Sequence, residues 1–206
     1  DDAPAIGSPN ALVTIVKATW HLPRGSDELE LARPQRGIRP IDVPWGLPGE
    51  STPMLPEDFC VYKPGTDVVV AARAFPPGGR PAEQWDVSVR VGPIGRVLRV
   101  FGLRVWQKAG QGISAPRPIP ELELRYEHAW GGMQVDDQGR VAEEGRNPMG
   151  RGVALELATL THQPAPQIDD PFDLIRSAET AHVPVGVAPI PRNWQPRRNR
   201  KPLCPS

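Results

Sequence analysis

Proline and glycine are the residues that most limit what this chain can fold into. The 206 residues include 27 Pro and 20 Gly, against an ordinary usage of about 5% Pro and 7% Gly. Proline lacks a backbone N–H and is disfavoured inside helices and central strands. Helical patterns are correspondingly poor: only 152–160 and 170–180 are candidate helices, and the first fits a strand equally well. The composition therefore predicts short elements joined by turns and stiffened loops.

The rest of the composition predicts a folded globule rather than a disordered chain. Apolar residues make up 39% of the sequence and six of the residues are tryptophan, which is more than disordered segments have to bury. Basic and acidic side chains are equal at 24 each, which argues against nucleic acid or an anionic membrane as the general partner. No apolar run approaches the ~20 residues that span a bilayer.

The cysteines and the first residues bear on the compartment. The only two cysteines are Cys60 and Cys204. They permit one bridge, but reduced thiols in a cytoplasmic protein are the default expectation. The start, Asp1-Asp2-Ala3-Pro4, lacks the basic and apolar regions of a signal peptide. We therefore expect a cytoplasmic protein.

Period-two alternation predicts the strands. In 84–91, the residues Trp85, Val87, Val89 and Val91 alternate with polar residues, as in a strand with one buried face. A turn at 92–95 follows. Further strands are predicted at 11–20, 28–32, 67–74, 97–100, 103–106 and 121–126.

Two of these strands carry specific expectations. The segment 28–32 is predicted to pair with 11–20 across a turn at 23–26. The segment 67–74, with its run Val68-Val69-Val70, is predicted to be a buried strand. The remaining stretches 33–58 and 163–171 are predicted to be long loops.

These elements predict a mainly β protein. We expect an antiparallel β-sandwich or irregular barrel, with long Pro/Gly-rich loops and at most one or two short helices. No internal repeat or clean linker divides the chain, so 1–206 is interpreted as a single domain.

Patterns typical of catalysis or metal binding are sparse. The histidines at positions 21, 128, 162 and 182 lack the spacing of a zinc site. The acidic stretch Asp136–Gly139 fits a hairpin turn better than a calcium loop, and Asp169-Asp170-Pro171 fits a turn or helix cap. We therefore expect no metal, no cofactor, no small-molecule substrate and no enzymatic activity.

The positive signal is a set of tryptophans and arginines near Gly-rich turns. These two residue types dominate interface hot spots. Alternatively the tryptophans fill the core and the arginines bridge loops; Trp194, which lies among Pro and Arg, is expected to be exposed. The candidate partner-binding residues are Arg104, Trp106, Trp130, Arg146, Asn147, Arg151, Trp194 and Arg197.

Seven short motifs, taken in order, resemble a known family. Each is weak alone, and together they span about residues 11–197. They are Val16–Leu22, Tyr62–Val68 followed by Pro77-Gly78-Gly79, Val91-Gly92-Pro93, Phe101–Trp106, Tyr126–Gly132, Arg146–Gly152 and Val183–Ile190. In this order they resemble the uncharacterised-domain (DUF) family of accessory proteins encoded beside type VI secretion spike and effector genes in Gram-negative bacteria.

The resemblance implies a cytoplasmic adaptor or chaperone without enzymatic activity. It would bind an effector, often one with a PAAR tip domain, and help to load it onto the VgrG spike. Members usually carry Arg where this chain has His128. They also usually continue past the equivalent of Trp194–Arg197, so this chain can be the N-terminal part of a longer family domain.

Two other functions remain open from the sequence. Glu127 and His128 are adjacent, and with an Asp such as Asp170 they can be interpreted as a hydrolytic site. Tryptophans on a β scaffold alternatively suggest a carbohydrate-binding β-sandwich, for which a coplanar row of exposed tryptophans is the expected feature.

Overall fold

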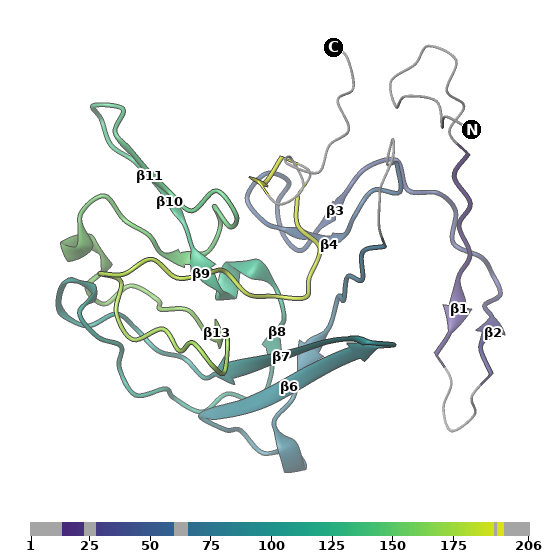
Figure 1. The fold of residues 1–206 in the computed structure, drawn as a ribbon, viewed down its shortest axis with the longest axis horizontal. Coiled ribbons are helices and arrows are strands. Elements are labelled where there is room, and N and C mark those ends of the chain that lie inside the picture. Colours follow the sequence, from purple (N-terminus) through teal and green to yellow (C-terminus); the bar gives the residue numbers. More distant parts are fainter. Residues whose placement is uncertain (1–13, 23–27, 60–65, 192, 196–206) are drawn as a thin grey trace.

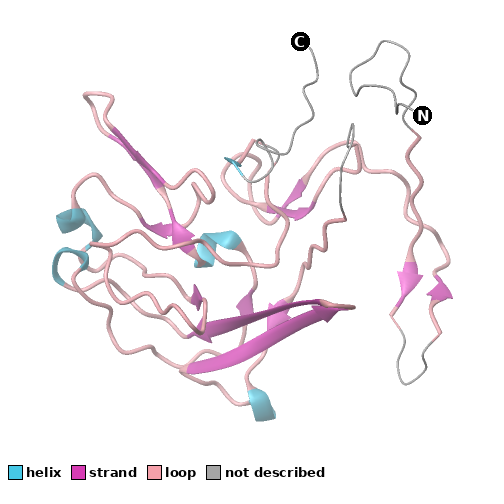
Figure 2. Cartoon of the chain, in the orientation of Figure 1, coloured by secondary structure: helices cyan, strands magenta, loops and turns pink. Residues whose placement is uncertain are grey.

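The protein is a mainly β fold built from many small sheets. The computed structural model describes residues 14–22, 28–59, 66–191 and 193–195. Of these, 31% are in strands or bridges and 8% are helical, which confirms the predicted class (Figures 1 and 2). The sheets are mostly antiparallel, and the described strands close no barrel.

The strands are short, as the proline and glycine content predicts. Only two of them are longer than three residues. The strands are β1 (Trp20–His21), β2 (Glu30–Leu31), β3 (Val43–Pro44), β4 (Pro53–Leu55), β5 (Arg73–Ala74), β6 (Gln84–Val91), β7 (Ile94–Phe101), β8 (Leu122–Glu123), β9 (Trp130–Gly131), β10 (Met133–Val135), β11 (Val141–Glu143), β12 (Arg151–Gly152) and β13 (Ile168–Asp169).

The β6–β7 hairpin is the largest regular unit. The alternation at 84–91 predicts β6 with the bounds that the structure shows. A two-residue loop, Gly92-Pro93, joins it to β7, and Gly92 takes a positive φ of 57°. Glycine is preferred at the first position of a hairpin turn of this kind because it adopts positive φ without strain. β13 adds to β7 and completes a sheet in the order β13-β7-β6.

Helical structure is sparse and short, as the fold class predicts. Four single-turn 3-10 helices lie among the described residues: η1 (Pro77–Gly79), η2 (Lys108–Gly110), η3 (Tyr126–His128) and η4 (Leu157–Leu160). The segment 170–180 forms no helix, because Ile175 N–H donates to the Asp169 carboxylate at 3.1 Å instead of to a helical carbonyl.

The expectation of a buried strand at 67–74 was wrong except at β5. Val68 and Val69 are 37% and 47% exposed. Val70 N–H donates to the Val187 carbonyl at 2.7 Å, but Pro184 and Pro189 flank that partner and lack the N–H groups that a continuous ladder needs. The segment therefore runs extended without becoming a strand.

The expected loops and the 103–106 strand also differ in detail. The stretch 33–58 holds the β3–β4 hairpin, and 163–171 holds β13. Leu103, Val105 and Trp106 make single bridges to three separate partners rather than a strand. Asp136–Gly139 forms the predicted turn, between β10 and β11.

Two clusters of buried side chains form the core. The first lies against the β6–β7 sheet and is built around Trp85, Leu98, Val100, Leu122 and Ile168. The second is built around Trp106, Trp130, Leu160, Ala165 and Ile175. The described part of the chain contains no helix that is long and apolar enough to cross a membrane.

An extended arm projects from this body. We define the arm as residues 14–22 and 28–41, which include β1 and β2 and lie to one side of the molecule in Figure 1. β1 and β2 pair antiparallel, with Trp20 opposite Leu31. The predicted pairing of 28–32 with 11–20 is therefore confirmed only at the end of that segment, because residues 14–19 form no strand. Ala32 N–H donates to Thr19 O at 2.8 Å. The predicted turn at 23–26 lies outside the described residues.

Candidate functional site

Three of the sequence motifs meet in space, and we call this region the motif junction. It comprises 126–132, 146–152 and 183–190. β9 and β12 bring the first two together as a parallel pair, with Trp130 opposite Arg151. Gly132 N–H donates to the Asn147 carbonyl at 2.9 Å, and Arg151 N–H donates to the Ala129 carbonyl at 3.0 Å. Segments some 20 residues apart are therefore fixed to each other through their backbones.

Asn147 is the polar centre of the motif junction. Its side chain is fully buried, and Nδ2 donates to the carbonyls of Tyr126 and Trp130, both at 2.8 Å. Two donor hydrogens thus satisfy two buried acceptors on one short segment, which a buried loop requires. The role of Asn147 is to hold the turn between η3 and β9.

Trp130 is packed between aromatic rings in the second core cluster. Its ring lies edge-on to Trp106, with centroids 6.3 Å apart, and to His182, with centroids 4.8 Å apart. Edge-to-face pairs of this kind add to the stabilisation from burial. Both tryptophans are almost fully buried, at 0% and 3% exposed, so they contact the chain itself.

The expected exposure of Trp194 was wrong. Trp194 is 4% exposed, because its ring packs edge-on to Tyr126 at 5.9 Å. Gly186 lies against the same tyrosine: a Cβ added at that glycine would be 2.8 Å from the ring. The third motif therefore supplies a small residue where Tyr126 and Trp194 need room.

Arg104 is also buried, in an ion pair with Asp169. Its Nη2 donates to Asp169 Oδ1 at 2.7 Å, and Nε donates to the Pro166 carbonyl. The guanidinium lies 3.8 Å from the centroid of the Phe101 ring, which adds a cation–π contact. Asp169, predicted to be in a turn or cap, is instead the buried counter-ion that ties β13 to the end of β7.

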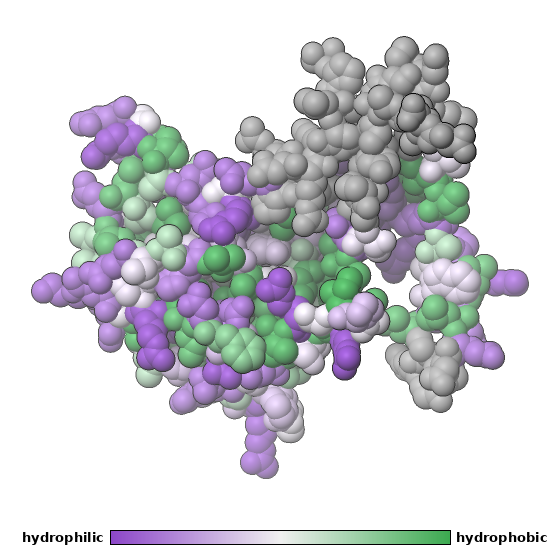
Figure 3. All heavy atoms as spheres, viewed as in Figure 1, coloured by the Kyte–Doolittle hydropathy of each residue, from purple (hydrophilic) through white to green (hydrophobic). Residues whose placement is uncertain are grey.

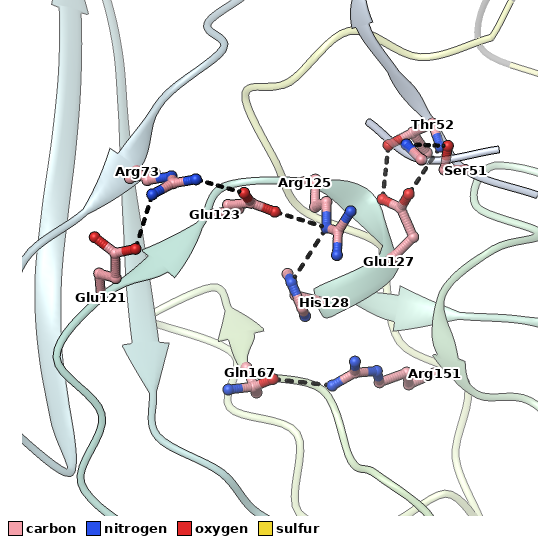
Figure 4. A network of polar contacts seen from close by, with 11 residues as sticks. Ser51, Thr52, Arg73, Glu121, Glu123, Arg125, Glu127, His128, Arg151 and Gln167 are labelled. Atoms are coloured by element: carbon pink, nitrogen blue, oxygen red, sulfur yellow. Dashed lines mark hydrogen bonds and ion pairs between the residues drawn. The ribbon is translucent and has the colours of Figure 1, made fainter. Parts of the chain in front are cut away.

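The arginines of the second motif keep some exposed surface. Arg146 holds Glu144 through two bonds of 2.7 and 2.6 Å, and its side chain is 41% exposed. Arg151 Nη1 donates to Gln167 Oε1 at 2.9 Å (Figure 4). Arg146 Nη2 also donates to the His182 carbonyl at 3.5 Å. Both arginines therefore bridge loops, which is the alternative to partner contact that the sequence left open.

Arg125 and His128 form a pair close to Arg151. Arg125 Nε donates to His128 Nε2 at 3.3 Å (Figure 4). Burial, followed by the positive charges of Arg151 and Arg125, lowers the pKa of His128 to about 3. His128 is therefore neutral near pH 7, and its Nε2 accepts a hydrogen bond.

Glu127 and His128 do not form an acid–base pair in this structure. The Glu127 carboxylate accepts the Thr52 N–H at 2.7 Å and the Thr52 hydroxyl at 2.6 Å. In Figure 4 the two side chains engage different partners. Asp170 Oδ1 accepts the Phe172 N–H at 2.9 Å and closes a turn. Each residue of the hydrolytic interpretation thus has a separate structural partner.

A hollow opens beside the motif junction. It has a volume of about 440 Å³, and its lining includes Met133, Pro148, Met149 and Trp194. Pro148 and Met149 are the second-motif residues with accessible surface here. The hollow gives the second motif an open concave surface at Pro148 and Met149.

The candidate binding residues thus divide into three groups. Arg104, Trp106, Trp130, Asn147 and Trp194 are buried, whereas Arg146 and Arg151 are partly exposed. Arg197, with Cys60 and Cys204, lies outside the described residues. Contact of any of them with a partner stays a prediction. The sequence missed Thr52, Arg125 and Gln167, which no local pattern marks.

The tryptophans form no exposed row of the kind that a carbohydrate site needs. All six lie within the described ranges, and four of them, Trp85, Trp106, Trp130 and Trp194, are buried. Trp20 is 51% exposed and sits on the arm. The described residues also contain no group of three His, Cys, Asp or Glu side chains arranged to hold a metal ion.

The sequence matches a known protein family. Residues 8–203 match DUF2169, a family described as uncharacterized proteins conserved in bacteria. The chain belongs to the DUF2169 family. No match was found among curated proteins or among solved structures. The DUF2169 match includes both the arm and the motif junction, so their geometry is that of a DUF2169 protein.

Proposed function

We propose that this DUF2169 protein is a type VI secretion accessory protein of Gram-negative bacteria. As an adaptor or chaperone it binds an effector or a PAAR-tip protein in the cytoplasm and helps to load it onto the VgrG spike. The order of the seven motifs is one support. The observation that carries the proposal is the unburied apolar surface of the arm.

Many large apolar side chains of the arm are exposed to solvent. The exposed fraction is 87% for Val16 and 86% for Leu22, and other exposed apolar residues lie in or beside β1 and β2 and in 33–41. The exposed large apolar residues of the arm are Val16, Trp20, Leu22, Leu29, Leu31, Ile38 and Ile41. Apolar atoms gathered in this way mark interaction surfaces, and hydrophobic side chains are visible on the arm in Figure 3.

The arm is anchored, although little of it is packed. Arg39 N–H donates to Asp58 Oδ2 at 2.6 Å, and Lys17 pairs with the same carboxylate. The two paired residues of β1 and β2 are too few to be stable alone. Fully burying one Leu or Val side chain against a partner is worth about 1.5–3 kcal/mol. A protein partner that covers the arm would therefore gain stability from several such contacts.

The chemistry of the arm favours a protein as the partner. The chain carries equal numbers of basic and acidic residues, so no general attraction for a polyanion is present. Aliphatic side chains at 50–87% exposure, such as Leu22 and Leu31, instead suit an apolar protein surface of the kind found at the core of an interface.

The test is co-purification with the effector, PAAR protein and spike protein encoded beside the gene. The chain should retain at least one of them. A triple variant of the arm, Leu22→Ser, Leu29→Ser and Leu31→Ser, should weaken retention at least about tenfold, since each tenfold is only about 1.4 kcal/mol. The matched control is Phe172→Ser, which removes a 94% exposed apolar side chain outside the arm and should retain the partner.

Two results would count against the proposal in different ways. A folded chain that retains none of the three proteins removes the secretion function. Retention that survives the triple arm substitution but is lost in Phe172→Ser would keep the function and remove the arm as the contact surface.

A further inference from the structure

The outer edge of β6 has no strand beside it. In the sheet β13-β7-β6, β6 is an end strand of eight residues. Its register with β7 is continuous from Gln84 opposite Phe101 to Val91 opposite Ile94. Figure 1 shows β6 at the border of the sheet, away from β13. A regular edge of this length is a template for pairing with another strand.

The even-numbered residues of β6 direct their backbone groups to this edge. Val91 and Ile94 close a two-residue hairpin loop, so they bond to each other, and every second residue back along β6 also bonds to β7. The Gly102 N–H that donates to the Glu83 carbonyl at 2.8 Å follows the same alternation. Asp86, Ser88 and Arg90 therefore present their N–H and C=O groups outward.

Little protects this edge. Ile119 bonds to Ala82 through both backbone groups, at 3.1 Å each, and so covers the chain just before β6. Within the described residues, no backbone bond from outside the β6–β7 ladder reaches 84–91. The strand contains no proline, glycine or lysine and no bulge. These are devices by which proteins usually block an exposed edge.

The sequence of the edge is complementary to itself. In an antiparallel pair centred on Ser88, Asp86 stands opposite Arg90 of the second strand, and Arg90 stands opposite its Asp86. On the other face, Val87 meets Val89, and Trp85 meets Val91. Opposite charges and apolar residues in directly opposed positions both stabilise a strand pair.

We propose that β6 pairs with β6 of a second copy of this chain, antiparallel and centred on Ser88. The pairing joins two three-stranded sheets into one continuous sheet across a two-fold axis. A two-fold axis presents the same surface from both copies, which the palindromic order of Asp86 and Arg90 satisfies. This inference is independent of the proposed secretion function.

The charges that the pairing needs are accessible. Arg90 is exposed, and its side chain makes no hydrogen bond or ion pair within the described part of the chain. Asp86 accepts two bonds from Arg99, at 2.8 and 2.9 Å, yet its side chain stays 44% exposed. Val91, which is 49% exposed, gains Trp85 of the second copy as a neighbour.

The association should be weak and dependent on concentration. One strand pair is much smaller than the ~1,600 Å² of a standard interface. We therefore expect a monomer–dimer equilibrium, visible by sedimentation velocity at protein concentrations up to about 1 mM. A chain that stays monomeric over that range overturns the proposal.

Disulfide trapping tests the register directly. In a background of Cys60→Ser and Cys204→Ser, the variant Ser88→Cys places two thiols on opposed residues, about 5.5 Å apart between Cα atoms, within the range for a disulfide. The control is Gln84→Cys on the same edge, whose two copies would lie about 27 Å apart. Ser88→Cys should form a covalent dimer at least about tenfold faster. Equal rates overturn the proposed register.

A charge variant tests the pairing without changing the monomer. Arg90→Asp places two carboxylates opposite each other at both ends of the pair and should weaken dimerisation at least about tenfold. Arg176→Asp makes the same charge change at another exposed arginine, whose side chain makes no hydrogen bond or ion pair within the described ranges, and should dimerise like the unmodified chain. If Arg90→Asp also dimerises like the unmodified chain, the proposal is wrong.

Discussion

The buried ion pair between Arg104 and Asp169 is expected to contribute strongly to the stability of the fold. Arg104 is 7% exposed and Asp169 is 0% exposed. Arg104→Met removes the side-chain cation that bonds Asp169 within the described residues and leaves a buried carboxylate. Breaking a buried pair in this way costs about 3–5 kcal/mol. We expect that loss in the free energy of unfolding, measured by urea denaturation.

A double variant separates the loss of the ion pair from the cost of leaving one buried charge unpaired. Arg104→Met combined with Asp169→Leu removes both charges, and replacing a buried pair by apolar residues is often neutral. The double variant should therefore be more stable than Arg104→Met alone. If Arg104→Met loses less than about 1 kcal/mol, the ion pair does not hold β13 to the end of β7.

His128 gives the molecule a pH dependence of known sign. Its pKa is about 3 in the folded chain because of burial, Arg151 and Arg125, whereas an unfolded histidine titrates near ~6.5. Between these values the unfolded chain binds more protons, so stability falls as the pH falls. The contribution of His128 is fully present above pH ~6.5 and is lost progressively towards pH 3.

The variant His128→Gln isolates this titration. Glutamine still offers an oxygen to Arg125 but cannot be protonated. Urea unfolding midpoints measured from pH 7.5 to pH 4.5 should fall less steeply for His128→Gln than for the unmodified chain. Parallel curves for the two proteins would show that His128 does not carry the acid sensitivity.

The pairing of β9 with β12 depends on a glycine that allows close packing. Gly152 takes a φ of 123°, and a Cβ at this position would lie 2.4 Å from the Trp130 ring and 3.1 Å from the Trp106 ring. Gly152→Ala combines this clash with a backbone conformation that alanine adopts poorly. Overpacking typically costs about 1–3 kcal/mol. We expect the free energy of unfolding to fall by that amount and the thermal midpoint to fall with it.

A second glycine provides the matched control. Gly37 has an ordinary φ and no atom within 4 Å of an added Cβ. Gly37→Ala should therefore change the free energy of unfolding by no more than about 0.5 kcal/mol, as a neutral surface substitution does, and leave the thermal midpoint nearly unchanged. If Gly152→Ala behaves in the same way, the close contact of β12 with the tryptophans is not required for stability.

The elements were predictable where the pattern is local. β6 follows from the alternation of Trp85, Val87, Val89 and Val91, because one face of a hairpin must be buried. The run Val68–Val70 has the composition of a buried strand, but the segment that it meets at Val187 is flanked by prolines that cannot extend a ladder. Composition does not record which partner a segment meets. Strand existence was predictable at β6 and not at 67–74 for that reason.

The contacts of the motif junction were not predictable from the sequence. The motifs marked the right segments, but Asn147 serves as a hydrogen-bond centre, and Trp194 is buried by Tyr126. Thr52 meets Glu127 across 75 positions of sequence. Such contacts depend on the tertiary fold and leave no spacing that a reader of the sequence can recognise.

Across the whole protein, stability and partner binding are expected to reside in different parts. The body buries Trp106 and Trp130, whereas the arm leaves Leu22 and Leu31 exposed. Trp130→Ala should cost about 3–5 kcal/mol, the range for truncating a buried aromatic residue. The triple arm variant of Leu22, Leu29 and Leu31 to Ser should cost no more than about 0.5 kcal/mol at each site.

Thermal or urea unfolding of the two variants, together with the co-purification test, shows whether stability and binding reside in different parts. The arm variant should have an unfolding midpoint close to that of the unmodified chain and should still lose its partner, as expected of a binding surface on a folded protein. Trp130→Ala should unfold early. If the arm variant instead unfolds as early as Trp130→Ala, the exposed leucines belong to the folding core, and their exposure cannot mark a docking surface.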